Sequence, residues 1–158
     1  MPIFTFLRDP VPRFLSSIGQ ALKLNNLGSC TKHFRVKKDT LELVDCVLLE
    51  IQQSQRYLDE HLEPQIFELY YGTMGVNLNV HLMDLKAMGG VLQDLFGLPS
   101  HQLSRRQSKG LVLGFNLSVA SLTPEVISRI CTVYSMDVLF LRETKVTSTI
   151  CENYLTDK

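Results

Sequence analysis

Hydrophobic residues recur at helical spacing in three stretches of the chain, and each stretch follows a residue that can cap a helix. These stretches cover residues 11–24, 39–63 and 123–134. Asp39 and Glu42 have the spacing of a capping box, and Pro64 is expected to end the second helix after about six turns. A weaker helix is expected over residues 85–96, where two adjacent glycines each cost roughly 1 kcal/mol of helix stability.

Alternating hydrophobic and polar positions predict strands elsewhere in the chain. The expected strands cover residues 3–7, 31–38, 66–71, 76–82, 111–120, 138–141 and 146–150. The runs 66–71 and 76–82 flank a loop that contains two glycines, which is typical of a hairpin. Hairpins mixed with helices predict an α+β fold, a mainly antiparallel sheet with about four helices packed on it.

The length of 158 residues is typical of one domain, and the chain contains no internal repeat or low-complexity linker. We therefore expect a single globular domain over residues 1–158, with a polar tail at 153–158. Sixteen basic residues balance sixteen acidic ones. This balance argues against a strongly basic nucleic-acid-binding domain, and a net charge near zero favours association with copies or partners.

The cysteines are far apart in the sequence and form no C-x-x-C pair. They are Cys30, Cys46, Cys131 and Cys151. The apolar N-terminal stretch is broken by Arg8, Asp9 and Pro10, which is unlike a secretory signal. We therefore expect reduced thiols and an intracellular protein, cytoplasmic and/or nuclear and not secreted. No apolar run approaches the ~18 residues of a transmembrane segment.

Motifs of the common enzyme classes are absent from the sequence. It has no phosphate-binding loop, nucleophile elbow or zinc-protease helix, so we expect neither an enzyme nor a cofactor. Cys30 and His33 have the spacing of half a zinc site, but no second close pair completes it, and no metal is expected. The triplets Asp84-Leu85-Lys86 and Glu143-Thr144-Lys145 resemble nuclease metal sites, yet a helix cap at Asp84 and a turn at Glu143 are the simpler interpretations.

Two basic segments are the candidate binding sites for phosphate groups. Their residues are Lys32, Arg35, Lys37, Lys38, Arg105, Arg106 and Lys109. Together they would suit RNA, DNA or anionic lipid, although charged side chains also protect edge strands from aggregation, which is the favoured interpretation. Ser108 follows two arginines, as in sites of basic-directed kinases, and phosphate there would add nearly two negative charges, although an unmodified flexible loop is the favoured interpretation.

These observations favour a non-enzymatic protein–protein interaction protein, which means a complex subunit, an adaptor or a scaffold. A protein partner or a homo-oligomer is expected, and no small-molecule substrate is evident. The alternative is a nucleic-acid or anionic-membrane binding protein that uses residues 32–38 and 105–109. A small viral structural protein would combine both hypotheses.

Overall fold

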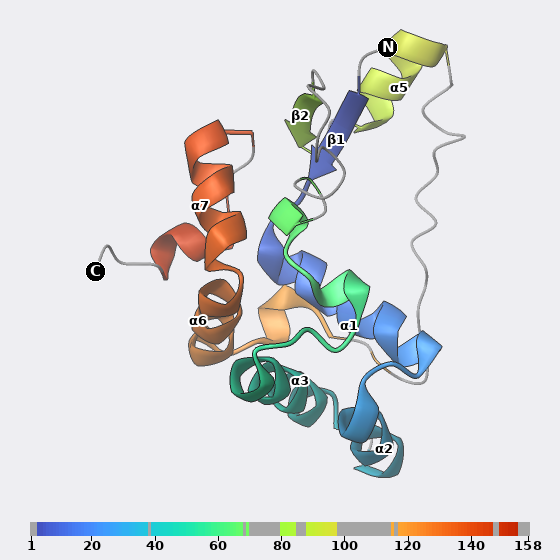
Figure 1. Cartoon of the computed structure of the whole chain (residues 1–158), viewed down its shortest axis with the longest axis vertical. Coiled ribbons are helices and arrows are strands. Elements are labelled where there is room, and N and C mark those ends of the chain that lie inside the picture. The colour runs from blue at the N-terminus through green and yellow to red at the C-terminus, as the bar shows by residue number, and fades with distance from the viewer. Residues whose placement is uncertain are drawn as a thin grey trace.

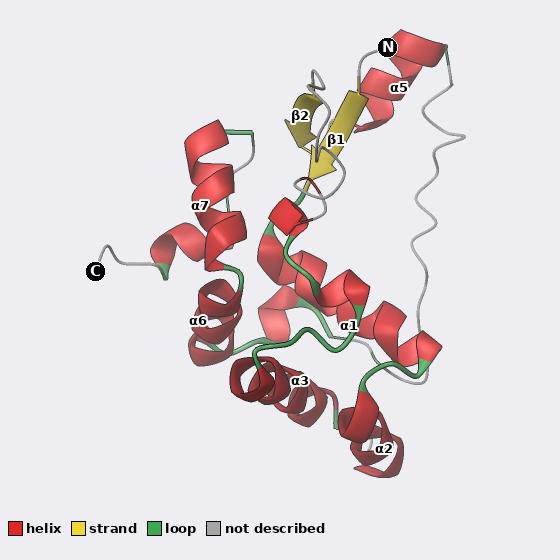
Figure 2. Ribbon diagram, viewed as in Figure 1, coloured by secondary structure: helices red, strands yellow, loops and turns green. Residues whose placement is uncertain are grey.

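The computed structural model describes residues 3–37, 39–67, 69, 80–84, 88–97, 115, 117–146 and 149–154. The described part of the chain is mostly helical, and the sheet within it has two parallel strands (Figures 1 and 2). The expected α+β fold with a mainly antiparallel sheet is therefore wrong. None of the helices among the described residues is long and apolar enough to cross a membrane.

The described part of the chain contains strands, α-helices and 3-10 helices. The strands are β1 (Ile3–Leu7) and β2 (Val80–Asp84). The α-helices are α1 (Pro10–Leu24), α2 (Gly28–Lys37), α3 (Thr40–Ser54), α5 (Met88–Phe96), α6 (Pro124–Val133) and α7 (Ser135–Thr144). The 3-10 helices are η1 (Glu60–Leu62), η3 (Val119–Ser121) and η4 (Ile150–Asn153).

The core lies where α1, α3 and α6 meet, with α2 below them and the strands above in the view of Figure 1. The three helices begin where their caps predict: the side chains of Asp9, Asp39 and Thr123 accept backbone N–H groups of Val11, Glu42 and Val126. The helix expected over residues 11–24 is confirmed, and its apolar stripe is buried. Those buried residues are Val11, Phe14, Leu15, Ile18 and Leu22.

Helix α3 ends earlier than its sequence pattern predicts. Gln55 adopts a left-handed conformation with φ of 53°, so the helix stops at Ser54 instead of continuing to Pro64. Leu62, which continued the apolar stripe, is buried from η1 instead. On the outer side, Arg129 of α6 places Nη1 2.8 Å from Oδ1 of Asp45, which links α6 to α3.

Two expected strands are helices. Residues 31–38 were expected to be a strand, but residues 28–37 form α2, which packs against α3. Its buried positions have helical spacing and include a cysteine and a threonine. They are Cys30, Thr31 and Phe34, and Leu27, the residue just before the helix, is buried as well. Residues 138–141 likewise belong to α7, in which Asp137, Val138 and Leu141 are buried at helical spacing and not at alternate positions.

The sheet pairs segments that are distant in the sequence. The strand expected at residues 3–7 is confirmed as β1, which pairs in parallel with β2 from Ile3–Val80 to Leu7–Asp84. The expected strand over residues 66–71 is wrong, because residues 65–67 are helical. Of the expected strand over 76–82, residues 80–82 belong to β2, whereas residues 70–79 of the expected hairpin lie outside the described part of the chain. The described residues of the strands expected at 111–120 and 146–150 are not in strands, and these segments run into η3 and η4.

The helix expected over residues 85–96 is confirmed as α5, which begins at Met88. Gly89 and Gly90 lie in its first turn. No described atom lies within 4 Å of the position that a Cβ would take at either glycine, so the pair is not a site of close packing within the described structure.

Candidate functional site

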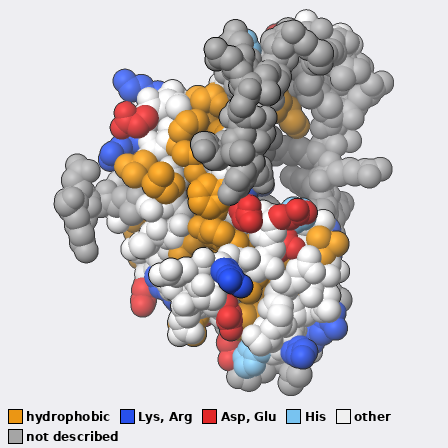
Figure 3. Space-filling model, viewed as in Figure 1, with side chains coloured by type: hydrophobic (Ala, Val, Ile, Leu, Met, Phe, Trp, Pro, Cys, Tyr) orange, Lys and Arg blue, Asp and Glu red, His pale blue; other side chains and the backbone are white. Residues whose placement is uncertain are grey.

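Helix α7 has one buried side and one exposed side. Asp137, Val138 and Leu141 are buried, whereas Met136 and Leu139 expose 54% and 40% of their surface. Phe140 is half-buried beside them. We call Met136, Leu139 and Phe140 the α7 face. Hydrophobic side chains gather over this part of the surface in Figure 3, with charged side chains beyond them at the end of the helix.

A buried carboxylate anchors the start of α7 on the side opposite the α7 face. The two oxygens of Asp137 accept the backbone N–H groups of Gln65 and Ile66, each at 2.9 Å. Burial raises the pKa of Asp137, although these N–H groups and the charge of Arg13 act in the opposite direction. Because both oxygens accept backbone donors from a segment distant in the sequence, this carboxylate anchors α7.

Tyr134, which lies between α6 and α7, adds a second buried anchor. Its hydroxyl donates to the carbonyl oxygen of Leu62 at 2.5 Å. Its ring packs on Phe14 and Tyr57, with centroids 5.8 Å and 6.1 Å away. Burial raises the pKa of Tyr134 and also that of Tyr57. Both phenols therefore remain neutral and serve to fix the junction of the two helices.

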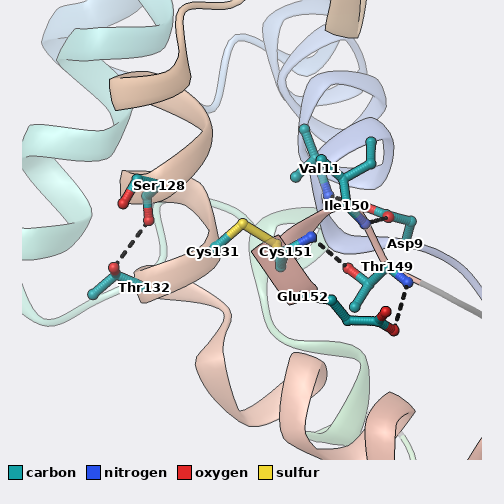
Figure 4. The surroundings of a disulfide bond; sticks show 9 residues. All are labelled: Asp9, Val11, Ser128, Cys131, Thr132, Thr149, Ile150, Cys151 and Glu152. Carbon is teal, nitrogen blue, oxygen red and sulfur yellow. Dashed lines mark hydrogen bonds between the residues drawn. A yellow bond between two sulfur atoms is a disulfide. The ribbon is translucent and has the colours of Figure 1, made fainter. Parts of the chain in front are cut away.

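A disulfide closes the segment that contains α7. Cys131 of α6 is bonded to Cys151 of η4 (Figure 4). All of α7 lies between these two cysteines in the sequence and therefore inside the covalent loop. The loop is also fastened to α1, because Asp9 Oδ2 accepts the N–H of Ile150 at 2.5 Å. Thr149 and Glu152 form a capping box at the start of η4. The helix that carries the α7 face is thus restrained by a disulfide-closed loop.

The geometry of the α7 face matches a known mode of protein recognition. Met136, Leu139 and Phe140 have the i, i+3, i+4 spacing of the anchors by which a helix enters an apolar groove. Arg142 and Glu143 follow at the exposed C-terminal end of the helix and give the apolar patch a charged border. This face was not expected, because residues 138–141 were predicted to be a strand; the helical spacing of Met136, Leu139 and Phe140 was the available signal.

A second polar cluster surrounds Asp59, which caps η1. Its Oδ1 lies 2.6 Å from Nδ1 of His61, and its Oδ2 accepts from Nδ2 of Asn26 at 2.6 Å. Burial alone would raise the pKa of Asp59, but the hydrogen bonds from Asn26 and His61 outweigh it and lower the pKa. A carboxylate that orients a histidine is found in catalytic triads. Among the described residues, however, no hydroxyl or thiol is hydrogen-bonded to His61.

The contribution of Asp59 to the free energy of unfolding should decrease at acid pH. Asp59→Ala is expected to lower the free energy of unfolding by about 2 kcal/mol at neutral pH, because the hydrogen bonds to a charged acceptor are lost. Since the folded pKa lies below the ordinary 3.8, this contribution is complete above that value and is lost as pH falls through the folded pKa. Urea denaturation at pH 6 and pH 2.5 measures the difference between the proteins.

Glu60→Ala, in the same 3-10 helix at an exposed position, is the matched control and should change stability little at either pH. A stability difference for Asp59→Ala that stays constant on acidification would contradict the assignment.

The structure brings together few of the basic residues expected to bind phosphate. Lys32 and Arg35 are exposed on α2, one turn apart, and Lys37 is the last residue of that helix. They belong to a helix, so their expected role in protecting an edge strand is wrong. The other predicted residues lie outside the described part of the chain. These are Lys38, Arg105, Arg106, Lys109 and the candidate phosphorylation site Ser108.

The weaker metal motifs are not supported by the geometry. Cys30 is bonded to Cys46, and Nε2 of His33 lies 2.7 Å from Oε1 of Glu42, so both residues with the spacing of half a zinc site have other partners. Glu143 lies in α7 and not in a turn. Asp84 ends β2, and Lys86 lies outside the described residues. Within the described ranges, no three potential ligands among His, Cys, Asp and Glu gather to hold a metal ion.

Comparison with known proteins adds no relative, since no family model, curated protein or solved structure matches this chain.

Proposed function

We propose that this is a non-enzymatic protein that binds another protein through the α7 face. The observation that carries the proposal is the exposure of Met136 and Leu139 on a helix whose opposite side is anchored by buried groups. Single exposed apolar side chains are normal on protein surfaces, but these two are adjacent on one helix and border Phe140. A rigid support lowers the entropic cost of binding, because fewer degrees of freedom are lost in the complex.

Leu139→Glu should weaken the complex at least about tenfold, because a buried carboxylate would replace an anchor in an apolar groove. The measurement is affinity purification of the tagged protein from its native source, with partners quantified by mass spectrometry. Circular dichroism confirms that the variant is folded. Light scattering of the purified protein reports self-association, which would identify a second copy as the partner.

Leu49→Glu is the matched control, because Leu49 is similarly exposed on α3 and the substitution is the same. It should leave the complex intact. Equal loss with both variants, or retention of every partner with Leu139→Glu, would exclude the α7 face as the binding surface.

The alternative of nucleic-acid or anionic-membrane binding has less support. Among the described residues it rests on Lys32 and Arg35, which are exposed on one side of α2. Two cations would neutralise few phosphates, and affinity for a polyanion grows with the number neutralised. A complex that disappears on nuclease treatment and depends on Lys32 and Arg35 would favour this alternative over the α7 face.

The expected cytoplasmic or nuclear location rested on reduced thiols. All four cysteines are paired in disulfides, so the expectation of reduced thiols is wrong. We therefore do not extend the intracellular location to the proposed function, because reducing compartments keep thiols from pairing.

A further inference from the structure

Every cysteine of the chain is used in a bond between two different elements. Cys30–Cys46 joins α2 to α3, and Cys131–Cys151 joins α6 to η4. The Cα atoms of the two pairs are 5.8 Å and 5.4 Å apart, within the range that a disulfide requires. Cys30, Cys131 and Cys151 are fully buried. The fold therefore positions four cysteines for bonding and leaves no free thiol.

The two bonds also pair each cysteine with its nearest neighbour in the sequence. The separations are 16 and 20 residues. Either alternative connectivity would close loops roughly four to eight times longer, which disfavours each wrong bond on the order of tenfold in an unfolded chain. Loop closure and the native fold therefore favour the same connectivity, so the correct bonds are accessible before the core has formed.

We propose that this chain is a substrate for thiol oxidation and matures in an oxidising compartment, such as the lumen of the endoplasmic reticulum or a bacterial periplasm. For each bond, two thiols lose two protons and two electrons. The electrons pass to the disulfide of a thiol–disulfide oxidoreductase through a mixed disulfide, which reduces that enzyme to its dithiol. The two bonds then persist because an oxidising environment contains no excess of attacking thiolate.

The test is to trap the thiols of the protein in its native source. Cells are quenched in acid, denatured and treated with a maleimide that adds measurable mass to each free thiol. We expect no addition before reduction and four additions after it, since the chain has four cysteines. Any addition before reduction, whether on two cysteines or on four, would overturn the proposal.

Peptide mapping of the same unreduced sample assigns the bonds. We expect one peptide pair that contains Cys30 and Cys46 and another that contains Cys131 and Cys151. Refolding of the reduced, purified protein in a glutathione buffer with urea is the second measurement. Native pairs should exceed each mixed pair on the order of tenfold, and an even mixture would overturn the argument from loop length. None of these outcomes depends on the α7 face, so failure of the binding proposal would be seen separately.

Discussion

Replacing Cys131 and Cys151 together by alanine should lower the free energy of unfolding by about 3 kcal/mol. The bond spans 20 residues, and without it the unfolded chain recovers the conformational freedom of that loop. Both cysteines are fully buried, so loss of the sulfur contacts adds to the effect. Urea denaturation of the oxidised protein and of the double variant, followed by circular dichroism, gives the difference.

The same variant should also loosen α7 locally. Because the bond closes the loop that carries α7, amide hydrogen exchange there should increase more than in α1 or α3. Replacing Cys30 and Cys46 by alanine is the matched control, with a separation of 16 residues and an expected loss of similar size. Its local effect should fall on α2. Equal exchange rates for α7 in the two variants would mean that the Cys131–Cys151 bond does not position this helix.

The parts of the fold that the sequence predicted correctly have strong local signals. Helices α1, α3 and α6 each combine a cap with a continuous apolar stripe, and their starts agree with the caps at Asp9, Asp39 and Thr123. The end of α3 was missed, because Leu58 and Leu62 continue the stripe after the chain has left the helix. A residue that turns left-handed, as Gln55 does, carries little signal in the sequence.

The errors arose where polar or sulfur-containing residues occupy core positions. In α2 the buried side includes Cys30 and Thr31, so Phe34 alternating with its polar neighbours resembled a strand. In α7 the buried Asp137 interrupts the apolar stripe, and the run after it has the composition of a strand. Disulfide pairing and the hydrogen bonds of Asp137 both depend on segments that are distant in the sequence. Local patterns therefore did not reveal the α7 face.

Asp137→Ala should lower the free energy of unfolding by about 3 kcal/mol, because the N–H groups of Gln65 and Ile66 would lose a buried acceptor. Asp137→Asn keeps one acceptor oxygen and should have an intermediate effect. Glu143→Ala is the control on the same helix, since 77% of that side chain is exposed and its removal should change stability by less than about 0.5 kcal/mol. Urea denaturation at pH 7 provides the comparison, and an Asp137→Ala protein as stable as the control would remove this carboxylate from the anchoring of α7.

The pH dependence of the same variants tests the environment of the carboxyl group. Because burial raises the pKa of Asp137, the folded protein binds a proton more tightly than the unfolded chain, whose carboxyl has the ordinary value of 3.8. Its stabilising contribution is therefore complete below that value and decreases as pH rises through the folded pKa. The stability difference between the native protein and Asp137→Asn, which does not titrate, should narrow between pH 3 and pH 7. A difference that widens over this range would mean that the N–H groups of Gln65 and Ile66, together with the charge of Arg13, outweigh burial and hold the carboxylate ionised.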